Sequence, residues 1–361
     1  MEKYRVGIVG ATGMVGQRFI SLLKDHPWFE VNCVAASARS AGKTYREAVG
    51  ERWAFAWEIP EKVAGMTVVD AADIDEVSKH VDFVFCAVDM KKDEIRALEE
   101  AYAKHEIPVV SNNSACRGIE DVPMVVPEIN ADHLAVIEAQ KKRLDTKNGF
   151  IAVKPNCSIQ SYVPALTPLL DFEPEKVSVC TYQAISGAGK TFKTWPEMVD
   201  NVIPYIGGED EKSENEPLKL WGHVEDGKIV NATLPVISAQ CLRVACSDGH
   251  MAAVSVSFKK KPTIEQIKER WANYETEAQR LELPSAPKPF LQYFEDPSRP
   301  QTRLDRDFQN GFGVSIGRLR EDKLFDYRFV CLSHNTVRGA AGGGILTAEL
   351  LCRKGYIPHR V

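Results

Sequence analysis

Hydrophobic and polar positions in the first 150 residues alternate between two kinds of repeat. Five short apolar runs are typical of buried strands: 6–9, 31–36, 67–69, 83–88 and 109–111. Helical spacing of apolar residues follows the first run at 15–23 and recurs at 91–104. Strands that alternate with helices predict a mostly parallel, doubly wound sheet, the α/β arrangement of Rossmann-type domains.

The pattern changes after residue 150. Strand-like runs follow one another with few helices between them: 150–153, 177–184, 242–245, 251–258, 313–319 and 325–332. They predict an α+β domain with a mixed or antiparallel sheet, part of whose apolar face packs against another subunit. We expect a first domain at 1–155 and a second at 156–338, with a C-terminal helix in 339–361 that returns to the first domain.

The first predicted strand runs into the glycine loop Gly-Ala-Thr-Gly-Met-Val-Gly, and a helix follows. Strand, glycine turn and helix in this order predict a dinucleotide site, with the pyrophosphate at the helix N-terminus. The residues expected at this site are Gly10, Thr12, Gly13, Met14, Val15 and Gly16. The G-x-x-G-x-x-G spacing is a variant, so a glycine turn without a ligand is the alternative.

The end of the second predicted strand favours NADP over NAD. An NAD enzyme usually carries Asp or Glu there, on the ribose hydroxyls. Here Ser37, Arg39, Ser40 and Lys43 follow the strand, and hydroxyls and cations suit a 2′-phosphate. A solvated basic loop is the alternative interpretation.

Cys157 is the candidate nucleophile. It follows the apolar run 150–153 and the pair Pro155-Asn156, and the pattern predicts a helix from Ser158 that Pro164 shortens. A thiol at a helix N-terminus is stabilised as the thiolate, and the free N–H groups there can hold an oxyanion. Cys116 is a weaker rival, because no helical pattern begins directly after it.

His250 is the candidate acid/base group. It follows a turn at Asp248-Gly249, seven residues after Arg243, and histidine exchanges protons near neutral pH. By composition alone the acidic run 209–216 is a solvated loop. The glycine-rich run 333–344 predicts close backbone approach, either to a ligand or between packed helices.

Composition narrows the classes of partner and compartment. The 361 residues carry a formal net charge of −5, which argues against nucleic acid as the main partner. No apolar run approaches the roughly 18 residues of a membrane span, and the first residues run straight into a strand, so we expect neither membrane association nor a signal peptide. Nine scattered cysteines suit the reducing cytoplasm. Without a Cys-x-x-Cys pair, we expect no zinc site.

Taken together, the motifs resemble those of the aspartate-β-semialdehyde dehydrogenases, nearly end to end, and in detail the archaeal and fungal branch. The motifs that carry the resemblance are 10–16, Ser114-Ala115-Cys116-Arg117, Pro155-Asn156-Cys157-Ser158, Gln183 with 186–189, Glu216-x-x-Lys219, 243–250, 299–306 and 335–341. The resemblance implies a second domain like that of glyceraldehyde-3-phosphate dehydrogenase, and a homodimer or homotetramer.

The resemblance also implies a reaction and a set of roles. The reaction is NADPH-dependent reductive dephosphorylation of L-aspartyl-4-phosphate to L-aspartate-4-semialdehyde through a Cys157 thioester, in the biosynthesis of lysine (through diaminopimelate), methionine and threonine. His250 acts as acid/base and Gln183 orients the acyl group. The implied substrate residues are Arg117, Asn156, Glu216, Lys219 and Arg243. Further cofactor contacts are implied at Ser186, Gly187, Asn335 and Thr336.

Three alternatives remain at this point. Malonyl-CoA reductase, a paralogue in the same branch, would share Cys157 and His250 but would have little use for Glu216, because its substrate lacks an ammonium group. N-acetyl-glutamyl-phosphate reductase is a more distant relative. A non-catalytic NADP-binding subunit would not need the combination of Cys157, Gln183, Arg243 and His250.

Overall fold

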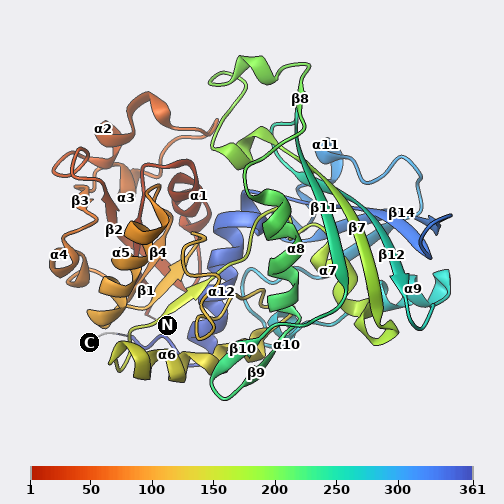
Figure 1. Cartoon of the computed structure of the whole chain (residues 1–361). Coiled ribbons are helices and arrows are strands. Elements are labelled where there is room, and N and C mark those ends of the chain that lie inside the picture. Colours follow the sequence, from red (N-terminus) through yellow and green to blue (C-terminus); the bar gives the residue numbers. More distant parts are fainter. Residues whose placement is uncertain (1, 360–361) are drawn as a thin grey trace.

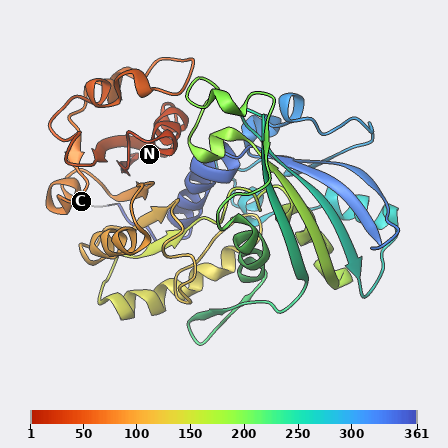
Figure 2. The same ribbon diagram turned by 45° about the horizontal axis from the view of Figure 1, so that its top comes forward.

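The computed structural model describes residues 2–359, which form two domains lying side by side (Figure 1). The first domain holds the N-terminal half, and the second holds most of the remainder. The C-terminal helix α12 Gly342–Arg353 lies between the two sheets in both views (Figures 1 and 2). In the described part of the chain, no helix is both long enough and apolar enough for a membrane span.

The first domain is built on a six-stranded parallel sheet with the order β3-β2-β1-β4-β5-β6. Its strands are β1 Tyr4–Val9, β2 Phe29–Ala36, β3 Val69–Asp70, β4 Phe83–Cys86, β5 Val109–Ser111 and β6 Ile151–Val153. This is the strand order of dinucleotide-binding Rossmann folds, in which ligands bind at the carboxyl ends of the strands. The predicted doubly wound sheet is confirmed, with strand ends shifted by a few residues.

Helices cover both faces of this sheet. They are α1 Met14–Leu23, α2 Tyr45–Val49, α3 Glu61–Ala64, α4 Ile74–Ser78, α5 Lys92–Lys104, α6 Ile137–Leu144 and α12, with 3-10 turns at Gly50–Arg52 and Ala131–Val136. The apolar residues of α12, such as Leu346 and Leu350, share a buried cluster with Phe19 and Phe85 of the first domain. The C-terminal helix therefore packs on the first domain. The exact domain boundaries stay a prediction.

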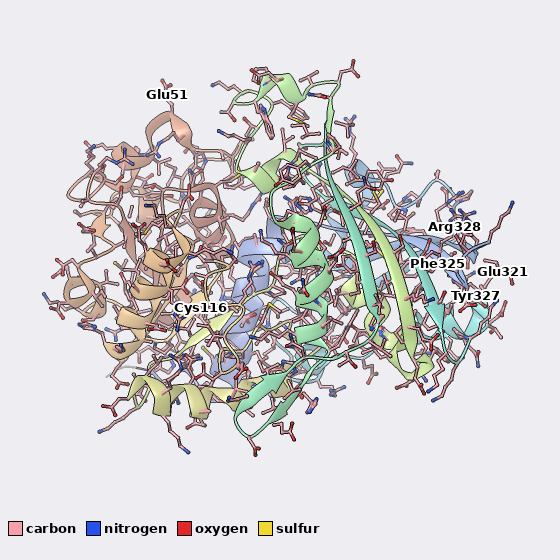
Figure 3. The ribbon with its side chains drawn as sticks, in the orientation of Figure 1. Glu51, Cys116, Glu321, Phe325, Tyr327 and Arg328 are labelled. Atoms are coloured by element: carbon pink, nitrogen blue, oxygen red, sulfur yellow. The ribbon has the colours of Figure 1, made fainter. Side chains whose placement is uncertain are left out.

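The second domain is built on a seven-stranded mixed sheet with the order β13-β14-β15-β12-β7-β11-β8. Its strands are β7 Pro174–Gln183, β8 Val202–Ile203, β11 Val236–Val244, β12 His250–Phe258, β13 Leu291–Phe294, β14 Val314–Glu321 and β15 Tyr327–Ser333. A small hairpin pairs β9 His223–Glu225 with β10 Lys228–Val230. The predicted mixed sheet is confirmed, and Figure 3 shows the tip of the β14–β15 hairpin, with Glu321 and Arg328, far from the first domain.

The remaining helical segments of the second half are short. They are α7 Val163–Leu166, η3 Thr167–Phe172, η4 Ile185–Ala188, η5 Pro196–Met198, α8 Glu209–Leu220, α9 Ile264–Ala272, α10 Glu277–Arg280, α11 Thr302–Asp305, η6 Phe308–Gly311 and the π-helical turn η7 Val337–Ala341. One face of the large sheet is buried, because Val179, Val254 and Phe329 share a cluster with Leu166 and Trp271. On the strands β7 and β11, Tyr182 and Val236 leave apolar surface exposed.

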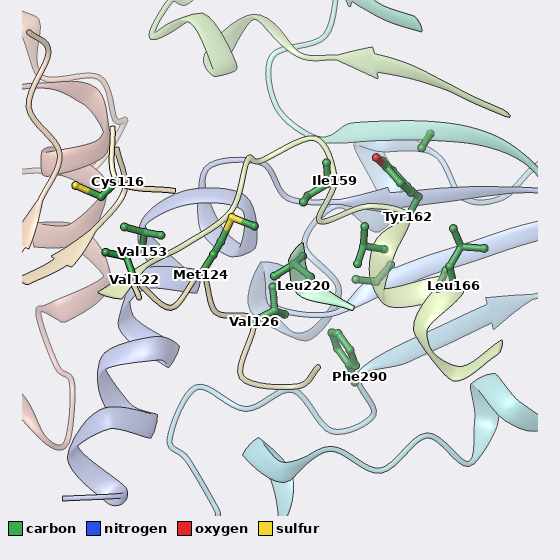
Figure 4. Close-up of a cluster of buried hydrophobic side chains, with 14 of the residues drawn as sticks. Cys116, Val122, Met124, Val126, Val153, Ile159, Tyr162, Leu166, Leu220 and Phe290 are labelled. Carbon is green, nitrogen blue, oxygen red and sulfur yellow. The ribbon is translucent and has the colours of Figure 1, made fainter. Parts of the chain in front are cut away.

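The two domains share a buried core beneath the junction. Figure 4 shows Cys116, Val122 and Val153 of the first domain in one cluster with Tyr162 and Phe290 of the second half. Such close-packed interiors have low compressibility, so the core fixes the position of the Cys157 segment between the sheets.

Two local predictions are wrong. The helix expected from Ser158 begins at Val163, and Ser158–Tyr162 form turns before it. The acidic run 209–216 is not a solvated loop but the first two turns of α8. Acidic residues in the first turn favour a helix through the helix dipole, and Glu209 forms an i,i+3 ion pair with Lys212.

Candidate active site

Cys157 and His250 come together at the junction of the domains. Cys157 follows β6, His250 opens β12, and the Cys157 Sγ lies 3.5 Å from the His250 Nε2. The Ala184 backbone N–H donates to the His250 Nδ1 at 3.0 Å. Since the Nδ1 accepts, a neutral His250 carries its hydrogen on Nε2 and points it at the sulfur. The geometry therefore favours a hydrogen-bond donor at the nucleophile.

The pKa values of Cys157 and His250 both differ from what the sequence led us to expect. Burial raises the pKa of Cys157 and Glu209 raises it further, while Lys154, Arg117 and Arg243 oppose them. The expectation that a helix N-terminus lowers this pKa is wrong, because no helix begins there. Burial, with a smaller contribution from Arg243, lowers the pKa of His250 to about 3, so the residue is neutral rather than half-protonated near pH 7.

The carboxylate of Glu209 organises this site, and sequence reasoning missed it. Its two oxygens accept hydrogen bonds from the Asn156 Nδ2, at 3.0 and 3.1 Å. One of them also accepts a hydrogen bond from the Gln183 Nε2, at 3.2 Å. The Lys212 Nζ donates to it at 2.8 Å. Buried positions at 209, 213, 217 and 220 follow helical spacing, but 209 and 213 carry polar side chains, so no hydrophobic pattern marks them in the sequence.

Asn156 has its side chain fully occupied within the protein. While the Nδ2 donates to Glu209, the Oδ1 accepts the Ser158 N–H at 2.7 Å and the Ser158 hydroxyl at 2.6 Å. An amide offers two hydrogens and two lone pairs, and all are used. These contacts hold the turn that carries Cys157, and the substrate-binding role expected for Asn156 stays a prediction.

Glu216 and Arg117 form an ion pair beside the same turn. The Arg117 Nη1 donates to the Glu216 Oε1 at 2.9 Å, and the Asn156 backbone N–H donates to the Oε2 at 2.5 Å. Both side chains are nearly buried, with about a tenth of their surface exposed. The Arg117 Nε is buried without a hydrogen-bond partner among the described residues. The structure thus brings these two predicted substrate residues to the nucleophile.

Lys219 lies differently from expectation. Its ammonium donates to three backbone carbonyls, those of Arg117 and Ile119 at 2.7 Å and that of Val122 at 3.0 Å. An ammonium has three hydrogens, so these bonds use its whole donor capacity. These bonds tie Lys219 to the loop of Arg117, and direct phosphate binding by Lys219 stays a prediction. Burial lowers its pKa to about 8.

Arg243 and Gln183 lie in register at the ends of paired strands β11 and β7. The Arg243 Nη1 donates to the Ala184 carbonyl at 2.7 Å, which leaves the rest of the guanidinium available. A Cβ on Gly187 would lie 2.8 Å from that Nη1 and 3.0 Å from the His250 ring. The motif that begins at Gln183 therefore wraps around Arg243 and His250.

A cavity of about 860 Å³ lies at the carboxyl ends of the parallel strands, where Rossmann folds bind dinucleotides. Gly10, Thr12, Gly13, Ser37, Arg39, Ser40 and Lys43 line it. Gly10 has φ +91°, and a Cβ there would lie 2.3 Å from the Ala87 carbonyl oxygen, so the turn requires glycine. Arg52 lines the cavity as well and was not predicted.

The other predicted cofactor residues lie outside the lining of this cavity. Met14, Val15 and Gly16 form the first turn of α1 behind the loop. Asn335 donates to the Ser186 hydroxyl at 2.8 Å and accepts the Gly249 N–H at 2.7 Å, which places Ser186, Gly187 and Asn335 beside His250. Thr336 is buried next to them. These residues connect the cofactor side of the junction with the Cys157 side.

The rival Cys116, labelled in Figure 3, is fully buried, and Figure 4 shows it in the core cluster that the two domains share. Burial raises its pKa, and the neighbouring Glu99 raises it further. A thiol without access to substrate and with a raised pKa is a structural residue. In residues 2–359, no three His, Cys, Asp or Glu side chains form a group able to hold a metal ion.

Two family models cover most of the chain. The semialdehyde dehydrogenase NAD-binding domain matches residues 5–137, and the semialdehyde dehydrogenase dimerisation domain matches residues 166–338. The glycine loop lies in the first of these segments, whereas Gln183, Glu216, Arg243 and His250 lie in the second.

Relatives from fungi and archaea match over nearly their whole length. Aspartate-semialdehyde dehydrogenase from Schizosaccharomyces pombe is 45% identical, over 98% of this chain and 99% of the relative. The enzyme from Archaeoglobus fulgidus is 43% identical, over 98% and 100%. A crystal structure of the Candida albicans enzyme with NADP superimposes with a TM-score of 0.89 at 39% identity, over 99% and 100% of the two chains. The chain therefore belongs to the aspartate-semialdehyde dehydrogenase family.

Proposed function

We propose that the protein catalyses the NADPH-dependent reductive dephosphorylation of L-aspartyl-4-phosphate to L-aspartate-4-semialdehyde, a step toward lysine, methionine and threonine. The observation that carries the proposal is the approach of Cys157 to His250 beside one carboxylate, Glu216, and two guanidinium groups, Arg117 and Arg243. A substrate with a carboxylate, an ammonium and a phosphate needs this combination of charges.

The chemistry begins at the sulfur. The Cys157 thiolate attacks the acyl carbon, a C–S bond forms, the bond from that carbon to the phosphate oxygen breaks, and inorganic phosphate leaves. The resulting thioester accepts a hydride, whereas a carboxylate resists it. NADPH supplies that hydride when bound. The neutral His250 Nε2–H donates a hydrogen bond to the oxygen that becomes negative as the hydride adds to the thioester carbon. The carbonyl then re-forms, the C–S bond breaks, and the Cys157 thiolate leaves.

Three charged side chains orient the substrate. Arg243 binds the α-carboxylate through the guanidinium nitrogens that do not contact Ala184. Glu216 binds the α-ammonium with the lone pairs that Arg117 and Asn156 leave available. Arg117 binds the phosphate. Gln183, held by Glu209, orients the acyl group.

NADP is the cofactor that suits the cavity at the carboxyl ends of the first sheet. Ser37, Arg39, Ser40 and Lys43 offer hydroxyls and cations to a 2′-phosphate at the end of β2. The similar enzyme from Candida albicans was crystallised with NADP, which supports this choice. An Arg39 variant, described in the Discussion, tests the extent of NAD use.

Self-association and location complete the proposal. Four large apolar side chains are exposed: Tyr182 on β7, Val202 on β8, Tyr205 in the segment before α8, and Val236 on β11. A second copy covers them in a homodimer or homotetramer. The matched dimerisation domain supports this association. We place the enzyme in the cytoplasm, where nine free cysteines stay reduced.

The reverse reaction tests the function. Purified protein with NADP and aspartate semialdehyde should form NADPH only when inorganic phosphate is present, and Cys157→Ser should abolish this while NADPH still binds. The fungal and archaeal relatives support neither malonyl-CoA reductase nor a non-catalytic NADP-binding subunit. Activity with malonyl-CoA and none with aspartate semialdehyde would contradict the proposal.

A further inference from the structure

Arg338 and Glu128 form a buried ion pair that the proposed mechanism does not use. Two guanidinium nitrogens of Arg338 donate to the two carboxylate oxygens of Glu128, at 2.8 and 3.2 Å. The Arg338 side chain is 3% exposed and the Glu128 side chain is fully buried. The residues are 210 positions apart, so the pair joins the loop before the 3-10 turn Ala131–Val136 to the turn η7 Val337–Ala341.

Further contacts fix both ends of this pair. The Arg338 Nη1 also donates to the Phe312 carbonyl at 2.8 Å, and the guanidinium carbon lies 4.4 Å from the centroid of the Phe290 ring. Phe290 belongs to the core cluster of Figure 4. The Tyr274 hydroxyl donates to the Glu128 backbone carbonyl at 2.9 Å. Because a two-pronged contact sets direction as well as distance, the guanidinium is held in one orientation.

The loop of Glu128 is hydrogen-bonded to the strand that leads to the nucleophile. The Val125 N–H donates to the Val153 carbonyl at 2.8 Å, and the Val153 N–H donates to the Pro123 carbonyl at 2.9 Å. Val153 is the last residue of β6, and the turn of Cys157 follows it. Glu128 is therefore anchored to the same stretch of backbone that carries Cys157.

The turn of Arg338 packs against the nucleophile. A Cβ on the next residue, Gly339, would lie 2.9 Å from the Cys157 Cβ, so the two segments are in close contact here. The Gly339 N–H donates to the His334 carbonyl at 3.0 Å, a π-helical bond, and such turns are frequent at functional sites. The Arg338 side chain is bound to the Glu128 loop, so its effect on the nucleophile passes through Gly339.

The same segment also reaches His250. Asn335 accepts the Gly249 N–H at 2.7 Å, and Gly249 directly precedes His250. The run 335–339 therefore contacts both partners of the 3.5 Å approach between the Cys157 sulfur and the His250 Nε2. A shift of this run would change that distance.

We propose that Arg338 is a positioning residue, which holds Gly339 against the turn of Cys157 through its ion pair with Glu128. The pair, Gly339, Cys157 and β6 form a closed ring of contacts. A buried ion pair adds little net stability once its desolvation is counted, so what this pair contributes is fixed geometry. The inference rests on the proposed function only in taking Cys157 as the nucleophile.

The test is the pH dependence of Cys157 alkylation by iodoacetamide in the full-length enzyme, followed on the Cys157 peptide by mass spectrometry. The variant is Arg338→Met with Glu128→Gln, because changing one partner alone leaves an uncompensated buried charge, and the double change leaves the net charge unaltered. A displaced turn removes the sulfur from the His250 hydrogen bond, which favours the thiolate. The midpoint should therefore rise by about one pH unit, and alkylation at pH 7 should slow roughly tenfold.

Steady-state kinetics give a second readout. Arg338 does not line the cofactor cavity, and its charge is paired with Glu128. We therefore expect kcat to fall about tenfold, whereas KM for aspartate semialdehyde and the dissociation constant of NADPH change by less than about twofold. A pair that served stability alone would lower the unfolding temperature and leave the kcat of the folded enzyme unchanged.

Arg5→Met with Asp82→Asn is the matched control. The Arg5 Nε and Nη2 donate to the buried Asp82 carboxylate at 3.1 and 2.7 Å, at the amino ends of β1 and β4, away from the site. This control removes the same two charges and should lower thermal stability without moving the midpoint or kcat.

The route through Gly339 can be tested by combination. An ammonium keeps the charge but does not reproduce the two-pronged contact, so Arg338→Lys should raise the midpoint in the same direction. Gly339→Ala displaces the same turn, so adding Arg338→Lys to it should raise the midpoint no further. Full additivity of the two shifts would show that Arg338 acts by another route and would overturn the proposal.

An unshifted midpoint or a wild-type kcat in the folded double variant would also overturn it. If the double variant does not fold, the same results in Arg338→Lys would do so. A shift of equal size in the Arg5 and Asp82 control would count equally against it. Alkylation needs no substrate, so failure of the aspartate semialdehyde assay would contradict the proposed function and leave the midpoint result intact.

Discussion

A methyl group on Gly339 would lie 2.9 Å from the Cβ of Cys157. Gly339 belongs to the π-helical turn η7 Val337–Ala341, which precedes α12, and Figure 1 shows α12 between the two sheets. The added atom would also meet the Cys157 Cα and carbonyl oxygen at 3.3 Å. These are positions of backbone rather than of a flexible side-chain end, so the turn of the nucleophile must shift to accommodate any Cβ.

Gly339→Ala should therefore impair catalysis more than folding. Overpacking of this kind costs about 1–3 kcal/mol, and displacement of Cys157 from His250 should lower kcat at least tenfold. The measurements are steady-state kinetics and thermal unfolding. Gly65→Ala is the control, because a Cβ there has no neighbour within 4 Å. If Gly339→Ala keeps wild-type kcat, the close approach has no catalytic consequence.

Glu209→Gln tests the carboxylate that sequence reasoning missed. The substitution removes the charge that Asn156, Gln183 and Lys212 contact, and an amide cannot accept from all three donors. Hydrogen bonds to a charged group contribute about 1.5–3 kcal/mol, so kcat should fall roughly tenfold or more while NADPH affinity changes little.

Glu211→Gln supplies the matched control for this prediction. Glu211 lies on the same first turn of α8 and is exposed, so its substitution should leave kinetics unchanged. Equal kinetics for the Glu209 and Glu211 variants would show that the buried carboxylate does not organise the site.

The first domain could be predicted from its sequence because its information is local. Most of its strands lie in apolar runs, and the glycine loop is contiguous, so periodicity and motif identify both. The helix α8 could not be predicted in this way, because three of its buried positions are polar: Glu209, Ser213 and Lys219. A hydrophobic pattern does not register polar side chains that are buried by hydrogen bonding.

The sequence predicted which residues meet at the site better than it predicted their hydrogen bonds and protonation. Cys157, His250 and Arg243 meet as the motifs imply, but their protonation depends on burial, which the sequence does not state. The direction of the Lys219 ammonium likewise depends on the fold of the loop 117–122, whose carbonyls lie about a hundred residues away in the sequence.

Acid should destabilise the protein through His250. Its pKa is lowered from 6.5 to about 3 in the folded state, so between these values the unfolded state binds one more proton than the folded state. Stability therefore falls as the pH drops below 6.5, by up to about 1.4 kcal/mol per pH unit. His334, whose pKa is lowered to about 4, contributes with the same sign.

Urea unfolding at pH 7.5 and 5.5 and at one subunit concentration measures this effect. His250→Gln should lose less stability between the two pH values than the wild type, by about 1.4 kcal/mol, because the unfolded histidine binds about half a proton on average over this range. The variant should still show the acid-dependent loss of stability that His334 contributes. Identical pH slopes for the variant and the wild type would show that His250 is not held neutral by burial.

Arg39→Ala tests the preference for NADP. Arg39 lines the cavity at the end of β2 together with Ser37 and Lys43, and its guanidinium is suited to a 2′-phosphate. Loss of one such charged contact, worth about 1.5–3 kcal/mol, should weaken NADPH binding tenfold or more and change NADH binding less than twofold. Dissociation constants for both cofactors, from quenching of tryptophan fluorescence, measure this.

Arg46→Ala is the control, because Arg46 is an exposed arginine that pairs with Glu61 and does not line the cavity. Because NADH lacks the 2′-phosphate, an equal loss for both cofactors in Arg39→Ala would mean that Arg39 binds a part of the dinucleotide common to the two.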